Sequence, residues 1–110
     1  MDANTLLHLF HVLIVGGLFL YIGMNREKTY GRLFPILIYL GALIILYHSY
    51  KLYGYLTAKK GIWVNLIHIF IVGPLLVYIG YYGEKTSRKF FEMLLMIGFA
   101  SIGYHLYYLF

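Results

Sequence analysis

Four long apolar runs dominate this sequence. Each holds about 20 residues, which at 1.5 Å per residue in a helix covers about 30 Å, the thickness of the hydrocarbon core of a bilayer. The runs are continuous, whereas a lipid-facing β-strand would alternate apolar and polar residues over about ten positions. We therefore predict helices, because only helices and closed barrels satisfy the backbone inside a membrane. The expected spans are residues 6–24, 33–53, 62–82 and 90–110.

The composition agrees with a chain that lies in a membrane. Of its 110 residues 62% are hydrophobic, and the mean hydropathy is +0.77. The chain has no cysteine, which excludes disulfides, thiolate metal sites, iron–sulfur clusters and covalently attached c-type haem. The net charge of +5 comes from Lys and Arg residues that lie almost entirely between the apolar runs. Such charges set membrane topology, so the lipid bilayer is the expected partner and nucleic acid is not.

The second half of the chain repeats the first with a period of about 57 residues. Roughly 20 of about 53 aligned positions are identical, which is far above chance and marks an internal duplication. The repeat predicts two tandem hairpins at residues 1–53 and 62–110, joined by a linker at residues 54–61. Each hairpin holds two spans, so both enter the membrane in the same direction. The expected fold class is an all-α integral membrane protein, a four-helix up-down bundle.

The two hairpin loops are the most basic parts of the sequence. Residues 25–32 and 83–89 share Glu-Lys-Thr and carry six of the nine basic residues. The positive-inside rule therefore predicts that both loops are cytoplasmic, with the two termini and the linker on the opposite side. Thr29 and Thr86, at the same position of the two loops, are expected to cap the helices that follow with their hydroxyl groups.

Glycines in the first and third spans indicate close helix packing. The pairs, each seven residues apart, are Gly16 with Gly23 and Gly73 with Gly80. In a regular α-helix Gly16 lies about 140° from His11, so these two residues need not face the same neighbour. Pro74 replaces Gly17 in the second copy, which predicts a local kink that distinguishes the two halves.

One histidine lies at an equivalent position in each span. The four are His11, His48, His68 and His105. Each is expected about five residues, or about 8 Å, inside the same end of its helix, so that all share one level. In an up-down bundle the first and third helices are diagonal, as are the second and fourth. His11 is therefore expected to oppose His68, and His48 to oppose His105. His8 lies one turn from His11 on the same face, and Asn65 takes its place in the second copy.

These four histidines allow three interpretations. They could ligate a haem b or hold a divalent metal ion, because neutral imidazole is a common ligand of both. They could also carry protons, because imidazole titrates near neutral pH. The third interpretation is structural and needs no cofactor, since the histidines lie among aromatic residues of the kind that gather at a membrane interface. This expected belt comprises Tyr47, Tyr50, Tyr53, Tyr55, Trp63, Tyr104, Tyr107 and Tyr108.

No sequence motif of a P-loop, a zinc protease, a serine hydrolase or a dinucleotide-binding fold is present. The first hypothesis is therefore a non-enzymatic structural or assembly protein that forms homo-oligomers or binds other membrane proteins. The residue usage is typical of AT-rich coding and would fit an organelle membrane or the inner membrane of a large DNA virus. The alternatives are a haem- or metal-binding redox carrier that uses His11, His48, His68 and His105, and a small transporter or proton channel.

Overall fold

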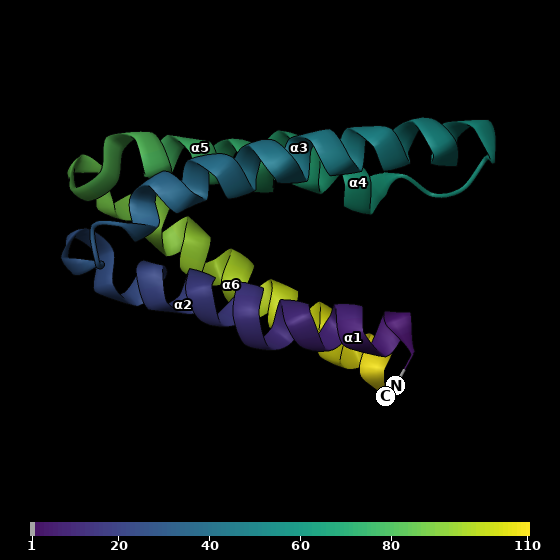
Figure 1. Ribbon diagram of the computed structural model, residues 1–110, viewed down its shortest axis with the longest axis horizontal. Helices are drawn as coiled ribbons and strands as arrows, with labels where there is room; N and C mark the ends of the chain where they lie inside the picture. The colour runs from purple at the N-terminus through teal and green to yellow at the C-terminus, as the bar shows by residue number, and fades with distance from the viewer. Residues whose placement is uncertain (1) are drawn as a thin grey trace. The chain divides into compact units, whose positions relative to one another are not determined.

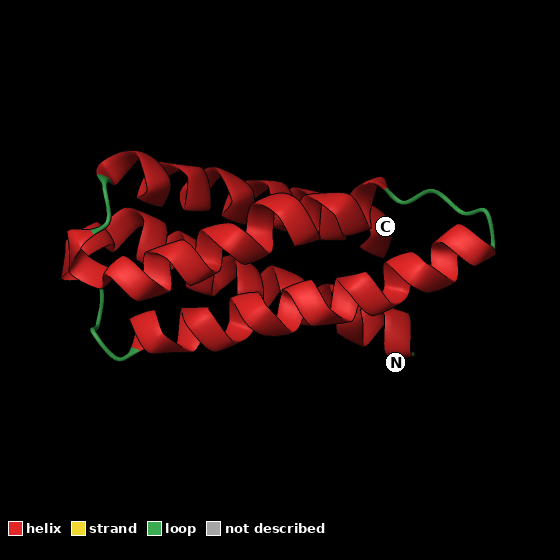
Figure 2. Ribbon diagram, turned by 90° about the horizontal axis from the view of Figure 1, so that it is seen from above, coloured by secondary structure: helices red, strands yellow, loops and turns green. Residues whose placement is uncertain are grey.

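The computed structural model describes residues 2–110, and every regular element in these residues is a helix (Figures 1 and 2). Four helical stretches are long and apolar enough to cross a membrane, and each contains most of one expected span. They are Ala3–Lys28, Leu33–Thr57, Trp63–Lys85 and Arg88–Leu109. The predicted all-helical class is confirmed.

Two of these stretches are continuous α-helices, α3 (Leu33–Thr57) and α6 (Arg88–Leu109). The other two are interrupted in the same way. The first consists of α1 (Ala3–Phe10), the π-helical turn η1 (His11–Val15), α2 (Gly16–Asn25) and the 3-10 turn η2 (Arg26–Lys28). The third consists of α4 (Trp63–Ile67), the π-helical turn η3 (His68–Val72), α5 (Gly73–Tyr82) and the 3-10 turn η4 (Gly83–Lys85).

The helices form two compact units. Unit 1 joins the chain up to Thr29 with Ser87–Phe110, and unit 2 is Tyr30–Thr86. Figure 1 shows α1 and α2 beside α6 in unit 1, and α3 beside α4 and α5 in unit 2. Each unit therefore combines one span from residues 1–53 with one span from residues 62–110. The boundaries of the two tandem hairpins stay a prediction from the sequence.

In both units the helices are antiparallel and meet at glycines. In unit 1 an added Cβ at Gly23 would lie 2.8 Å from Leu95 Cβ, and Gly16 lies against Ile102 farther along the same pair of helices. In unit 2 an added Cβ at Gly80 would lie 2.6 Å from the Phe34 carbonyl oxygen. The expected glycine faces are thus helix contacts, because a missing side chain lets two backbones approach closely.

The π-helical turns explain why His11 and Gly16 contact the same helix. The Gly16 N–H donates to the His11 carbonyl oxygen, five residues earlier, so this turn holds one residue more than an α-helical turn. The angle of about 140° expected for a regular helix no longer applies. The ring of His11 stacks on His105, and Gly16 packs against Ile102, one turn away on the same helix.

Pro74 does not distinguish the two halves as expected. Its segment carries the π-helical turn η3 immediately before it, but η1 occurs at the equivalent place, where Gly17 stands instead of proline. The Gly73 N–H donates to the His68 carbonyl oxygen as Gly16 does to His11. Proline is therefore compatible with this turn but is not required for it.

Thr29 and Thr86 lie in the turns at residues 25–32 and 83–89 and cap the helices that precede them. The prediction that they cap the helices that follow is wrong. The Thr29 hydroxyl donates to the Ile22 carbonyl oxygen and the Thr86 hydroxyl to the Ile79 carbonyl oxygen, both at 3.5 Å. The helices that follow, α3 and α6, have no side-chain hydrogen bond at the N-cap. The buried threonines instead give a second donor to two carbonyl groups near the ends of α2 and α5, which already accept the backbone N–H of Arg26 and of Gly83.

The central connection is shorter than the predicted linker. Helix α3 continues to Thr57, and its end is closed by a left-handed residue, Lys59, with φ of 58°. The Lys60 N–H donates to the Tyr55 carbonyl oxygen at 2.9 Å, and the Lys59 N–H donates to the Leu56 carbonyl oxygen at 3.3 Å. This pair of hydrogen bonds is the Schellman arrangement, which satisfies the last carbonyl groups of a helix.

The core begins at the end of the π-helical turns, with Val72 of η3, and extends to the turns at residues 25–32 and 83–89. The buried apolar side chains of unit 1 are Phe19, Ile22, Phe91 and Leu94, and those of unit 2 are Phe34, Leu37, Val72, Leu75, Leu76 and Ile79. Toward the other end of the helices, where the histidines lie, the described residues include no buried apolar side chain. The apolar core of each unit thus lies away from its histidines.

Candidate functional site

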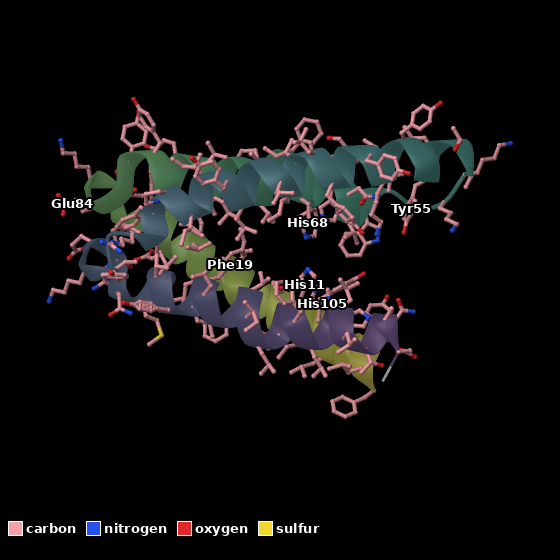
Figure 3. All side chains as sticks on the ribbon, viewed as in Figure 1. His11, Phe19, Tyr55, His68, Glu84 and His105 are labelled. Atoms are coloured by element: carbon pink, nitrogen blue, oxygen red, sulfur yellow. The ribbon has the colours of Figure 1, made fainter. Side chains whose placement is uncertain are left out.

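The four predicted histidines form two ring pairs, one in each unit. His11, at the start of η1, stacks on His105 of α6 with ring centroids 4.3 Å apart and planes at 25° (Figure 3). His68, at the start of η3, stacks on His48 of α3 at 4.0 Å and 17°. These pairs join neighbouring helices of one unit. The prediction that His11 opposes His68, and His48 opposes His105, concerns residues of different units and stays a prediction.

His11 and His68 are held by the turn that precedes them. The His11 Nδ1 lies 2.8 Å from the Leu7 carbonyl oxygen, and the His68 Nδ1 lies 2.7 Å from the Val64 carbonyl oxygen. A carbonyl oxygen only accepts, so Nδ1 must carry the proton and donate it. In the neutral ring Nε2 is then the basic nitrogen.

A further polar residue completes each cluster, and neither was among the predicted site residues. In unit 1 the His8 Nδ1 lies 2.8 Å from the His105 Nδ1, and in unit 2 the His48 Nδ1 donates to the Asn65 Oδ1 at 2.9 Å. Asn65 is only 2% exposed. The signal was present in the sequence, since His8 and Asn65 occupy the same position of the repeat, but the direction of their side chains depends on the π-helical turns.

Aromatic rings surround the histidines. Tyr104 forms a T-shaped contact with His105 at 5.2 Å between centroids, Tyr47 forms one with His48 at 5.3 Å, and Tyr108 stacks on His8 at 6.0 Å. On the outside of α3 the Lys51 ammonium lies 5.3 Å from the ring centroid of Tyr55. The histidines thus lie among the aromatic residues that the sequence suggested as an interfacial belt.

A haem does not fit between the paired rings of either unit. Two axial imidazoles must point a nitrogen at the iron from opposite sides, with the porphyrin plane between them. Rings stacked face to face at 4.0 Å and 4.3 Å leave no space for that plane.

A metal site with several protein ligands does not fit either. Among residues 2–110 no three His, Asp or Glu side chains are placed so that they could hold one metal ion. In unit 1 the closest ring nitrogens are 2.8 Å apart, a hydrogen-bond distance. An ion bridging them would need about 4 Å, because each zinc–nitrogen bond is about 2.0 Å long. The arrangement is one of hydrogen-bonded and stacked imidazoles.

Comparison of the chain with models of known protein families, with curated proteins and with solved structures finds no match.

Proposed function

We propose that this chain is a multi-pass integral membrane protein whose four helices cross a bilayer as two tandem hairpins, and that its role is structural. It associates with itself or with other proteins in the plane of the membrane. The proposal is supported by the exposed apolar side chains on the outward face of every span. Large apolar side chains in the middle of the four stretches are more than 60% exposed: Leu13, Leu43, Phe70 and Met96. Water would disfavour such surfaces, whereas lipid or a membrane partner would cover them.

A shallow apolar groove on unit 2 supports contact with lipid. Its volume is about 500 Å³, and it lies along α5 and one residue of α3. It is lined by Ile45, Pro74, Val77, Tyr78, Tyr81 and Tyr82. The tyrosines join an apolar ring to a polar hydroxyl, which suits the boundary between acyl chains and headgroups.

The proposed role in assembly follows from the small share of each span that is covered. Between 17% and 39% of the residues in the most apolar stretch of each span are buried. The glycine faces are already used in contacts within the units, so a partner would meet the outward aliphatic and aromatic faces. An enzymatic role is not part of the proposal. The membrane of an organelle or of a large DNA virus would be a suitable setting.

The proposed orientation places the turns at residues 25–32 and 83–89 in the cytoplasm. The cysteine-free chain makes this testable with single cysteines. Lys28→Cys and Lys85→Cys, which are exposed and equivalent in the two turns, should react with a membrane-impermeant maleimide from the cytoplasmic side. Lys59→Cys in the central connection should react from the opposite side. Labelling of all three from one side would contradict the proposed topology.

Self-association can be tested by crosslinking in native lipid. Leu43→Cys on the outward face of α3 should give a disulfide-linked dimer under mild oxidation, whereas Leu37→Cys on the same helix, with 0% exposure, should not. The corresponding outward variants Leu13→Cys, Phe70→Cys and Met96→Cys map the contact. A protein that stays monomeric at high density, with no crosslink at any outward position and no co-purifying partner, would overturn the structural role.

Two alternatives stand below this proposal: a haem- or metal-binding redox carrier, and a small transporter or proton channel. Within each unit the ring contacts do not fit haem, and no described group of three ligands fits a metal ion. An optical spectrum and metal analysis of gently purified protein test the first alternative, and proton flux into proteoliposomes tests the second. A Soret band lost in the double variant His11→Ala and His68→Ala would revive the cofactor hypothesis.

A further inference from the structure

The contact between His8 and His105 differs in kind from the other histidine contacts described above. His11, His48 and His68 each place Nδ1 on an oxygen, which can only accept. His8 and His105 instead place two identical ring nitrogens 2.8 Å apart. One Nδ1 must donate its N–H and the other must accept with its lone pair. Either ring can take either role, and once the pair has taken up one proton, the hydrogen between the two Nδ1 atoms can lie on either ring.

We propose that His8 and His105 form a proton-binding pair that takes up one excess proton and links α1 to α6 through it. With one added proton the pair is an imidazolium and an imidazole joined by an Nδ1–H···Nδ1 bond, and this charge-assisted bond is stronger than the bond between two neutral rings. With a second added proton both Nδ1 atoms carry hydrogen, neither can accept, and two like charges face each other. The pair therefore binds one proton and loses its hydrogen bond when it binds two.

Other titratable side chains contact the pair through their rings. They include His11, stacked on His105 at 4.3 Å, Tyr104, in a T-shaped contact with His105, and Tyr108, stacked on His8 at 6.0 Å. The His11 Nδ1–H is directed to the Leu7 carbonyl oxygen. The acid nearest along α1, Asp2, accepts the Thr5 N–H at the start of the helix.

Unit 2 contains the same arrangement without the second base. Asn65 stands in the place of His8, and its Oδ1 accepts the N–H of His48 at 2.9 Å. His68 stacks on His48 as His11 stacks on His105. An amide oxygen accepts a hydrogen bond but does not take up a proton near neutral pH. The two units thus hold equivalent hydrogen-bonded pairs. Both members of the pair in unit 1 can bind a proton, whereas only His48 can do so in unit 2.

The proposal is tested by NMR on the full chain with ¹⁵N-labelled histidine in lipid nanodiscs. We expect a ¹⁵N–¹⁵N coupling across the hydrogen bond between the Nδ1 atoms of His8 and His105, with both rings changing protonation in common steps as the pH is lowered. The coupling should disappear at acid pH, when both rings carry two protons. In His8→Asn the coupling should be lost, and His105 should titrate in a single step of its own.

The reverse substitution makes the test independent of whether His8→Asn folds. Asn65→His should create a second coupled pair with His48 in unit 2, because the backbone there already places a polar side chain at hydrogen-bond distance. Absence of any Nδ1 to Nδ1 coupling at every pH in the folded wild-type protein, together with independent titration of His8 and His105, would overturn the proposal. A wild-type coupling with no gain in folded Asn65→His would also contradict it, since the two clusters would then not be equivalent.

Discussion

Substitution of Gly23 by alanine tests the pairing of α2 with α6 most directly. A Cβ added at this position would lie 2.8 Å from Leu95 Cβ, 2.9 Å from Leu95 Cα and 3.0 Å from the Leu95 backbone nitrogen. Backbone atoms in the middle of a helix cannot rotate away as the tip of a side chain can. The methyl group can therefore be accommodated only if α2 and α6 move apart.

The expected size of the effect follows from two opposing terms. Non-bonded carbon atoms prefer separations of about 3.5–4.0 Å, so the two helices must separate by about 0.5–1 Å at this point. Overpacking of this kind costs about 1–3 kcal/mol. Replacing glycine by alanine inside a helix returns about 0.5–1 kcal/mol through the lower entropy of the unfolded chain. We expect Gly23→Ala to lower the free energy of unfolding by about 1–2 kcal/mol.

The measurement is reversible unfolding in mixed micelles with increasing SDS, followed by circular dichroism. Gly17→Ala is the matched control, because Gly17 lies in the same helix and an added Cβ there meets nothing within 4 Å. It should be as stable as the wild type or more stable by up to about 1 kcal/mol, since only the helix-propensity term acts.

Equal stability of Gly23→Ala and Gly17→Ala would contradict this expectation. The helices would then not approach at Gly23 as closely as described. Gly80→Ala should behave like Gly23→Ala, because its Cβ would lie 2.6 Å from the Phe34 carbonyl oxygen and 2.9 Å from the Ile38 backbone nitrogen.

Three further predictions concern the turns and the first helix. Arg26 has φ of 54° and ψ of −124°, and Gly83 has nearly the same conformation, with 56° and −130°. Glycine adopts it without strain, so Arg26→Gly should raise the unfolding free energy by about 1 kcal/mol and Gly83→Ala should lower it by a similar amount. Changes of the opposite sign would show that the backbone at these positions is not strained. Thr86→Val should cost about 0.5 kcal/mol in the same assay because the Ile79 carbonyl oxygen loses its hydroxyl donor, whereas Thr86→Ser should cost less. The Thr5 amide donates to the Asp2 carboxylate and lowers its pKa. This N-cap therefore stabilises α1 fully above the pKa of Asp2 in the unfolded chain, and the stabilisation is lost as the pH falls through the lower pKa of the folded chain. Amide exchange at Thr5 should therefore rise at acid pH in the wild type, and a flat profile would refute this linkage.

Much of the local structure could be predicted from the residues alone. The four apolar runs correspond to the four helical stretches, because apolar runs of about 20 residues favour helices over the shorter strands of a sheet. The glycine faces were also predictable, since Gly16 and Gly23 fall on one side of any helix that contains both. The threonines were recognised as capping residues, but the helix that each caps depends on the fold of the turn, and that prediction was wrong.

The contacts within the candidate site could be predicted only in part. The sequence identified His11, His48, His68 and His105 as equivalent, and it identified His8 and Asn65 as occupants of one repeat position. It did not identify which histidines meet. The histidine contacts depend on which helices pair: α6 with α1 and α2, and α3 with α4 and α5. They also depend on the π-helical turns, which no residue pattern in the sequence predicted.

The number, length and apolar character of the helices depend on neighbouring residues only, so they can be read from the sequence. The pairing of the first span with the fourth and of the second with the third depends on the folded chain, as do the contacts His11 to His105 and His48 to His68. All four spans offer similar apolar faces, so their sequences do not distinguish the partners. The choice among them depends on close backbone approach between distant segments, at Gly23 against Leu95 and at Gly80 against Phe34, which only the folded chain brings together.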